Sequence, residues 1–312
     1  HRRGMEFHAW LNPYRAVFNS ARSSVAPNHP TRLYKSWFVK YGDTGRSTTY
    51  FDPGNPEARQ FVTRVIADLV ERYDLDGVHF DDYFYPYLIP YKAGTNLPYK
   101  PIVINGDTWF DFPDAASYAL YGKGLDKAAW RRSNTDSIIL MLSQAIKSTK
   151  PWVKFGISPF GVWRNKAQDS MGSNTRAGQT NYDHLYADIL LWLKNGWIDY
   201  VVPQLYWEVG HDRADYTTLV NWWNQHSYGR HCYIGLAPYR AGSNTAWKDP
   251  KQLPKQIELS RSLPNLQGQV YFSSKSFVKN PNGWNDSLRN NLYKTAVPTP
   301  AMPWLAKKPA GN

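Results

Sequence analysis

The sequence lacks the features that define several common protein classes. It contains a single cysteine, Cys232, so an intramolecular disulfide and a cysteine-based metal site are both excluded. No apolar stretch reaches the roughly 18 residues that a transmembrane helix needs. HExxH, P-loop, GxGxxG and GxSxG motifs are missing, so zincin, nucleotide-binding and common hydrolase-triad functions lack support. We therefore expect no cofactor, no bound metal and no transmembrane segment.

Long runs of one charge are also missing, although the chain is strongly basic. The net charge is +12, but no run of five or more lysines and arginines occurs, so a basic tail is excluded. A basic face attracts nucleic acid, anionic lipid or an acidic polymer. Since no recognisable nucleic-acid module is present, we do not expect nucleic acid as a partner.

Aromatic residues are abundant, with 14 Trp and 22 Tyr, and aromatics make up 16% of the chain. Flat aromatic rings stack on the apolar faces of sugars, and Tyr and Trp add a polar edge. A large hydrophobic core would also use many aromatics. Composition leaves both interpretations open.

Short apolar runs alternate with amphipathic segments along the chain. This alternation predicts an α/β fold with a parallel sheet covered by helices. The predicted strands are Met5–Leu11, Gly77–Asp81, Val153–Ile157, Tyr200–Leu205, Cys232–Leu236 and Gln269–Phe272.

The clearest helix signal covers Pro56–Tyr73. Asn55 is a good N-cap, Pro56 suits the first helical position, and an apolar stripe follows. The other predicted helices are Lys127–Ser148, His184–Asn195, Tyr216–His226, one that begins near Pro250, and Asp286–Thr295.

Two features favour a barrel over an open sheet. Long loops, Ala16–Asp52 and Tyr83–Lys123, follow strands, and in a βα barrel the loops after strands build the active face. One side of each strand is also repeatedly polar or small, which suits a barrel interior better than an open sheet that is apolar on both faces.

The segment Asp76–Tyr83 contains the strongest candidate for chemistry. Asp81 and Asp82 are adjacent carboxylates at a strand end, where mutual repulsion raises one pKa. Glycoside cleavage uses one carboxyl as proton donor and another as nucleophile, base or charge stabiliser. Adjacent residues point different ways, so a second carboxylate from another strand, with Glu208 as the best candidate, would complete the site. For Asp82, an N-cap role or a salt bridge within the loop stays open, and for Glu208 a hydrogen bond to substrate or a place on the surface stays open.

Further residues near the strand ends are candidates for substrate binding. His8 and His79 face inward with Asp81, and either orient that carboxylate or form a metal site with it. Arg15 and Arg240 either bind an anionic substituent bidentately or form structural salt bridges. The sugar-platform candidates are Trp10, Trp163, Tyr206 and Trp207, and the remaining predicted contacts are Asn12, Tyr14, Tyr83, Ser158, Gln204 and Tyr239.

Several motifs together resemble the bacterial glycosyl-hydrolase-like 10 family over essentially the whole chain. They are the segments Gly4–Arg15, Asp52–Gly54, Asp76–Pro86 and Gly156–Gly161. The resemblance implies a TIM (β/α)8 barrel of which this chain supplies six units, with the first two units missing. It assigns residues 1–297 to the barrel and 298–312 to a linker.

The resemblance also implies a function. Such proteins are envelope lipoproteins, periplasmic in location, that cleave peptidoglycan glycan strands stripped of their stem peptides. The chain opens on His1 rather than Met, so we expect that a leading segment has been removed.

One departure concerns the mechanism. Asp76–Tyr83 is distantly similar to the chitinase DGxDxDxE strand, but Tyr83 occupies the position of the catalytic Glu. Asp82 is therefore expected to take the acid role. The alternative function is a non-catalytic, septal peptidoglycan-binding barrel.

Overall fold

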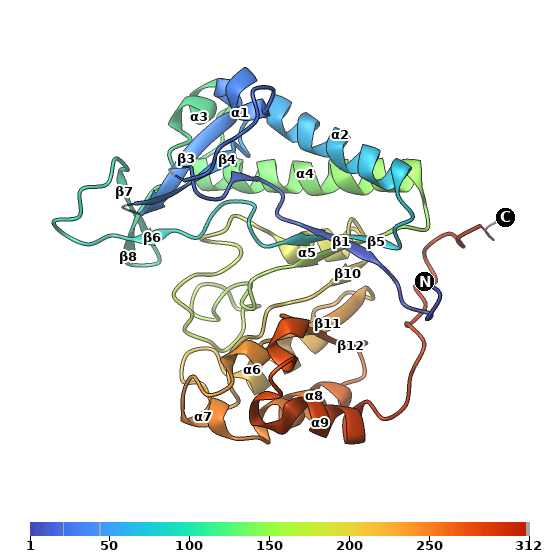
Figure 1. Ribbon diagram of the computed structural model, residues 1–312. Coiled ribbons are helices and arrows are strands. Elements are labelled where there is room, and N and C mark those ends of the chain that lie inside the picture. Colours follow the sequence, from blue (N-terminus) through green and yellow to red (C-terminus); the bar gives the residue numbers. More distant parts are fainter. Residues whose placement is uncertain (21, 44, 310–312) are drawn as a thin grey trace.

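The computed structural model describes residues 1–309 apart from 21 and 44, and its centre is a curled parallel sheet. Six strands follow one another in the order of the chain, with helices on the outer side of the curl (Figure 1). All six predicted strands are present: β1 (His8–Leu11), β5 (Gly77–Asp81), β9 (Lys154–Ser158), β10 (Tyr200–Val201), β11 (His231–Leu236) and β12 (Gly268–Tyr271). Strands β1 and β10 are shorter than predicted.

Helix α2 (Pro56–Arg72) begins as its sequence predicts. The Asn55 side chain accepts hydrogen bonds from the backbone N–H groups of Glu57 and Ala58, and Pro56 occupies the first position. The buried side of α2 packs on α4 (Lys127–Thr149), and both helices lie along one side of the sheet (Figure 1). Helices α6 (Tyr216–Gln225), α8 (Gln252–Arg261) and α9 (Trp284–Ser287) cover the same outer face at the other end of the curl.

Two helix predictions need correction. The helix expected over His184–Asn195 is α5 (Ile189–Lys194), because Asp188 caps it by accepting from the Leu191 N–H. The helix expected over Asp286–Thr295 starts earlier, at Trp284, and passes into a π-helical turn, Leu288–Leu292.

The two long segments predicted as loops contain small antiparallel sheets. One sheet has the order β2-β4-β3, with β2 (Arg15–Val17), β3 (Phe38–Asp43) and β4 (Arg46–Phe51). The other has the order β6-β8-β7, with β6 (Ile89–Pro90), β7 (Pro101–Ile104) and β8 (Asp107–Phe110). Asn105 and Gly106 both have positive φ in the β7–β8 turn, and an Asn-Gly pair is a hairpin signal that is visible in the sequence.

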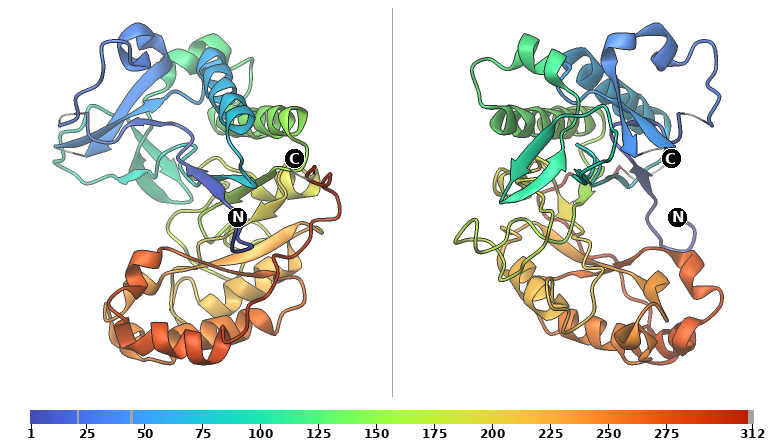
Figure 2. Two further views of the ribbon diagram at one scale, coloured as in Figure 1. Left: turned by 45° about the vertical axis from the view of Figure 1, so that its right-hand side comes forward. Right: turned by 90° about the vertical axis from the view of Figure 1, so that its left-hand side faces the viewer.

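Both inserted sheets lie at the end of the molecule away from the chain termini (Figures 1 and 2). The short helices α1 (Pro30–Leu33) and α3 (Ala115–Tyr121) accompany them. Since they follow β1 and β5, they place polar and aromatic side chains beyond the carboxyl ends of these strands.

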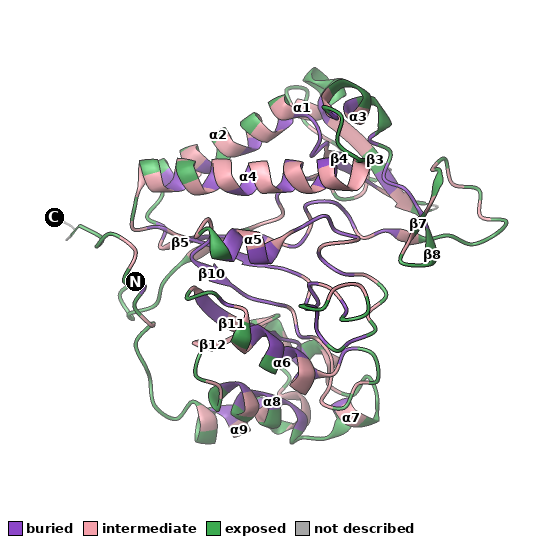
Figure 3. Cartoon of the chain, turned by 180° about the vertical axis from the view of Figure 1, so that it is seen from behind, coloured by how far each residue is buried: buried purple, intermediate pink, exposed green. Residues whose placement is uncertain are grey.

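The hydrophobic core lies between the sheet and its helices, where the buried sides of α4, α5, α6 and α8 face the strands (Figure 3). The predicted linker, residues 298–312, is described as far as residue 309 and contacts the amino-terminal end of the sheet. Trp304 donates its indole N–H to Asp199, and Lys308 pairs with Asp74. No described helix is long and apolar enough to cross a membrane.

Candidate active site

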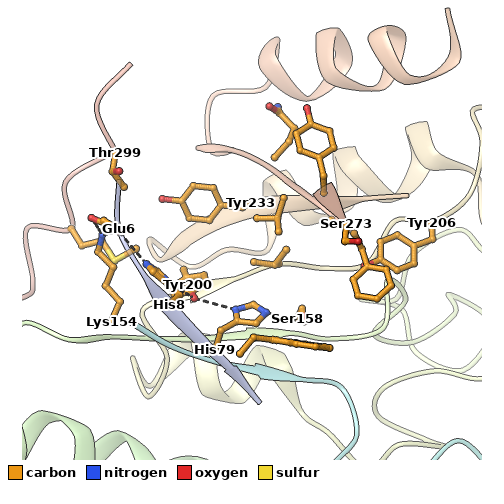
Figure 4. A pocket seen from close by; sticks show the side chains of 18 residues that line it. Glu6, His8, His79, Lys154, Ser158, Tyr200, Tyr206, Tyr233, Ser273 and Thr299 are labelled. Atoms are coloured by element: carbon orange, nitrogen blue, oxygen red, sulfur yellow. Dashed lines mark hydrogen bonds and ion pairs between the residues drawn. The ribbon is translucent and has the colours of Figure 1, made fainter. Parts of the chain in front are cut away.

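A cavity of about 520 Å³ lies on the inner side of the curled sheet (Figure 4). Glu6 and His8 enter it from the β1 segment, His79 from β5, and Lys154 and Ser158 from β9. These side chains occupy alternate positions along their strands, so the predicted polar inner face is confirmed for β1, β5 and β9.

A chain of hydrogen bonds crosses this interior. The Tyr200 hydroxyl lies 2.7 Å from Nδ1 of His8 and 3.0 Å from Nδ1 of His79. Nε2 of His79 lies 3.0 Å from Oγ of Ser158, and Nε2 of His8 lies 3.0 Å from Glu6. Burial lowers the pKa of His79 to about 3, so this ring is neutral and carries one N–H.

Glycines make room for this network. A Cβ atom on Gly156 would come within 2.1 Å of the Tyr200 ring, and one on Gly77 within 2.5 Å of the His8 ring. Both glycines therefore permit a large polar side chain from the neighbouring strand to lie across the sheet.

Asp81 ends β5 beside this cavity, and its carboxylate is held in place. Its Oδ1 atom accepts from the Asp82 backbone N–H at 2.9 Å and from Nε2 of Gln204 at 3.1 Å. Gln204 also donates to the carbonyl oxygen of Ser158 at 2.9 Å. The amide of Gln204, and not His79, therefore orients Asp81, which corrects that part of the expectation for His79.

Asp82 is buried, unlike a surface N-cap, and it accepts a hydrogen bond from the Tyr87 hydroxyl. Burial, together with the charge and a hydrogen bond of the neighbouring Asp81, raises the pKa of Asp82 well above its ordinary value. Asp82 is thus a carboxylic acid that keeps its proton where ordinary aspartates have lost theirs.

Partly exposed aromatic rings gather around the cavity, and Trp10, Tyr206 and Phe272 line it. Trp10, Tyr239 and Phe272 are 53%, 52% and 49% exposed. The Phe272 ring lies 6.3 Å from Trp10, 6.2 Å from Tyr239 and 6.4 Å from Tyr206. We call these four residues the aromatic rim. Its open ring faces suit stacking on sugars.

Phe272 was not predicted as a site residue. The polar side chains of β12 were expected on the inner side of the sheet, but the strand alternates in the opposite sense. Gln269 donates to Ser260 of α8, and the Tyr271 hydroxyl lies 2.6 Å from that of Tyr293, so these polar residues face the helices. Val270 and Phe272 consequently face the inner side, although they are the apolar residues of the strand. Tyr87 and Tyr200 were also not predicted as site residues. Only Tyr200 could have been found from the sequence, because the alternation of side chains along its strand indicates the inner face.

Two of the predicted sugar-contact residues are buried in the core, and a third is partly buried. Trp163 is 6% exposed and stacks on Trp222, so neither ring face is open. Tyr14 is fully buried. Trp207 packs its ring against Phe160 at 5.3 Å and belongs partly to the core. The first two cannot serve as platforms in this structure.

Glu208 is held by hydrogen bonds from residues near α7 (Thr245–Lys248). Its carboxylate accepts from Asn244 and from the Trp247 indole, each at 2.9 Å. Burial acts to raise its pKa, but hydrogen bonds from its own backbone, Trp247 and Asn244 outweigh burial, and the net shift is downward. These contacts anchor α7, which bears Trp247.

The two predicted anion-binding arginines share one property. Nε of Arg15 and Nε of Arg240 are buried without a hydrogen-bond partner, as is Oδ1 of Asn12. The Arg15 guanidinium lies over the Tyr83 ring, and that of Arg240 over Trp247. No ion pair joins either arginine to a carboxylate in the described part of the chain.

The alternative metal site at His8, His79 and Asp81 is not assembled. Each histidine bonds the Tyr200 hydroxyl, whereas Asp81 bonds Gln204. Within residues 1–309, leaving aside 21 and 44, no group of three or more His, Cys, Asp or Glu side chains is placed to hold a metal ion.

Comparison with known proteins identifies the family. Residues 1–252 match the family described as glycosyl hydrolase-like 10. The chain belongs to this family. The glycosyl hydrolase YngK of Bacillus subtilis is 44% identical over 314 residues, which cover 98% of this chain and 57% of YngK. The glycosyl hydrolase DigH of Escherichia coli K12 is 36% identical over 287 residues, covering 87% of this chain and 61% of DigH.

This member of the glycosyl hydrolase-like 10 family thus spans about three fifths of the length of these curated relatives. Among solved structures, the glycoside hydrolase domain of PgaB from Bordetella bronchiseptica shares the fold. The TM-score is 0.53 at 16% identity, and the match covers 92% of this chain and 75% of that domain.

Proposed function

We propose that this protein is a glycoside hydrolase in which Asp82 donates the proton to the leaving oxygen. The observation that carries the proposal is a buried aspartic acid with a raised pKa beside a second carboxylate at a strand end. A proton donor for glycosidic oxygen must be protonated at the working pH, and burial next to another carboxyl achieves this. Membership of the family supports the same reaction class.

We assign to Asp81 the role of stabilising the positive charge that develops on the sugar ring. Its carboxylate is fixed by Gln204 and is less buried than Asp82. Asp81 and Asp82 are adjacent residues at one strand end, and the charge of Asp81 raises the pKa of Asp82. We therefore do not place them on opposite sides of one bond, where separations of about 5 Å or more are usual. We propose that the acetamido group of the substrate supplies the nucleophile, and that Glu208 has the structural role its two hydrogen bonds indicate.

The proposed substrate is a glycan strand of amino sugars, in particular peptidoglycan stripped of its stem peptides. A net charge of +12 favours an acidic polymer, and the aromatic rim offers stacking surfaces for several sugars. The family resemblance points to the same polymer and to action at the cell envelope. We further propose that the six-stranded sheet is part of a (β/α)8 barrel, which the fold shared with PgaB supports.

The test compares wild-type protein with Asp81→Asn and Asp82→Asn on purified, stem-free glycan strands. Either substitution is expected to reduce the release of reducing ends by about 10²- to 10⁴-fold, because Asp82→Asn removes the general acid and Asp81→Asn removes the carboxylate that stabilises positive charge. Sedimentation with the glycan should be unchanged, since the aromatic rim is intact.

Glu208→Gln is the matched control, and it is expected to cleave within a few-fold of wild type. Fragment release at the wild-type rate by both aspartate variants would refute the assignment. Binding by the wild type without any fragment release would favour the rival function, a non-catalytic glycan-binding protein.

A further inference from the structure

Arg15 is a partly buried arginine that, like Arg240, forms no ion pair with a carboxylate among the described residues. Arg131 pairs with Asp114 at 2.6 Å, and Arg164 pairs with Asp183 at 2.9 Å. Arg15 instead lies between two aromatic rings, 5.1 Å from the centre of Phe18 and 4.1 Å from that of Tyr83. Such ring contacts hold a guanidinium in place but leave its in-plane N–H donors available.

The position of Arg15 connects it to the aspartate pair. The Tyr83 ring beneath the guanidinium packs on Tyr87 at 5.7 Å, and Tyr87 donates its hydroxyl to Asp82. Arg15 starts β2, and its pairing with Tyr50 of β4 fixes the backbone there. A substrate group bound by Arg15 would therefore be connected to the proposed proton donor, Asp82, through the contacting rings of Tyr83 and Tyr87.

Two phenol groups complete the surroundings of the guanidinium. Burial raises the pKa of Tyr83 and also that of Tyr50, so both hydroxyls stay protonated and can donate a hydrogen bond. Nε of Arg15 has no partner although it is buried, and an unpaired buried donor is costly. A fixed fork of N–H donors beside neutral hydroxyls is suited to a planar anion.

We propose that Arg15 is a specificity residue that binds a carboxylate carried by a sugar next to the scissile bond. A carboxylate fits better than a phosphate monoester. The latter carries about two negative charges, and a single arginine would leave one of them unbalanced near Asp81. The inference rests on the proposed function and deepens it, because it selects acidic amino-sugar polymers over neutral ones.

The experiment uses the same stem-free glycan in two forms, native and with its carboxylates chemically reduced to alcohols. For the wild type, reduction should raise KM about 10- to 100-fold, which corresponds to the loss of a charge-assisted hydrogen-bonded pair. Arg15→Gln should raise KM on the native form by the same factor and make the two forms equivalent. Arg15→Lys keeps the charge but not the fork, and should give an intermediate KM.

Arg46→Gln is the matched control, because Arg46 is an exposed arginine of the same inserted sheet. Its KM on both forms should equal that of the wild type. The pH dependence of kcat should stay unchanged in Arg15→Gln, since a role in tuning Asp82 would shift it on both substrates equally.

Two failures are distinguishable. If the wild type cleaves neither form, the proposed function is wrong. If it cleaves both forms with equal KM, or if Arg15→Gln raises KM equally on both, glycoside hydrolysis stands and carboxylate recognition by Arg15 is refuted.

Discussion

The protonation state of Asp82 links catalysis to folding stability. Burial and the neighbouring Asp81 raise its pKa in the folded protein, whereas in the unfolded chain it returns to the ordinary range near pH 4. Between these two pKa values the folded state binds the extra proton. The stability that Asp82 contributes is therefore complete below the unfolded pKa and is lost as the pH rises through the folded pKa.

Asp82→Asn should consequently stabilise the protein while it inactivates the enzyme. An asparagine carries no charge at any pH, and its side-chain oxygen can still accept the hydrogen bond from Tyr87. The melting temperature of the variant should exceed that of the wild type by a margin that grows from pH 4 upward. Thermal melts at several pH values check this, and a margin that is constant or falls with pH would contradict a raised pKa.

For individual residues, the sequence predicted the aspartate pair but not all of the residues around it. The Asp81–Asp82 motif, and Gln204 as a member of the site, were predictable because strand ends and alternation are local properties. That Trp163 and Tyr14 are buried was not predictable, since ring exposure depends on which helix covers the ring. Tyr87 lies six residues past the end of β5, where the chain has left the strand and alternation no longer indicates direction.

Strand β9 illustrates how one small residue shapes an element. Gly156 faces the interior, and the Tyr200 ring of the next strand fills the space where a Cβ atom would lie. Without that space the Tyr200 hydroxyl could not lie between His8 and His79. The glycine thus sets the position of the interior hydrogen-bond network.

Gly156→Ala should destabilise the protein by about 1–3 kcal/mol, the usual cost of overpacking a filled interior. Gly178→Ala is the matched control, because nothing lies within 4 Å of a Cβ at that position. Urea unfolding monitored by Trp fluorescence measures both free energies of unfolding. An unchanged value for Gly156→Ala would mean that Tyr200 is free to move and that the network is not fixed by the strand.

The six central strands were predictable because apolar runs bounded by turn residues recur along the chain. The inserted sheets after β1 and β5 were not, because the polar residues of their strands mask the alternation. Only the Asn105-Gly106 turn was a usable signal. These sheets matter for function, since β2 carries Arg15 and the segment before β6 carries Tyr83 and Tyr87.

For the whole molecule, the curl of the sheet brings distant segments to one place. Trp10 from the β1 segment meets Phe272 from the β12 segment, although 262 positions separate them in the printed sequence. A parallel sheet with outer helices could be predicted from the pattern of elements. The sequence could not predict which residues of the two edge strands meet across the curl, because this depends on which side chains of β12 face inward.

The central claim is that Asp82 protonates the leaving oxygen, and substrates with different leaving groups test it most directly. We propose to compare Asp82→Asn with the wild type on the glycan and on a dinitrophenyl N-acetylglucosaminide, whose leaving group needs no proton. The account predicts a loss in kcat/KM of about 10²- to 10⁴-fold on the glycan and of less than about tenfold on the aryl glycoside. Equal losses on both substrates would contradict it.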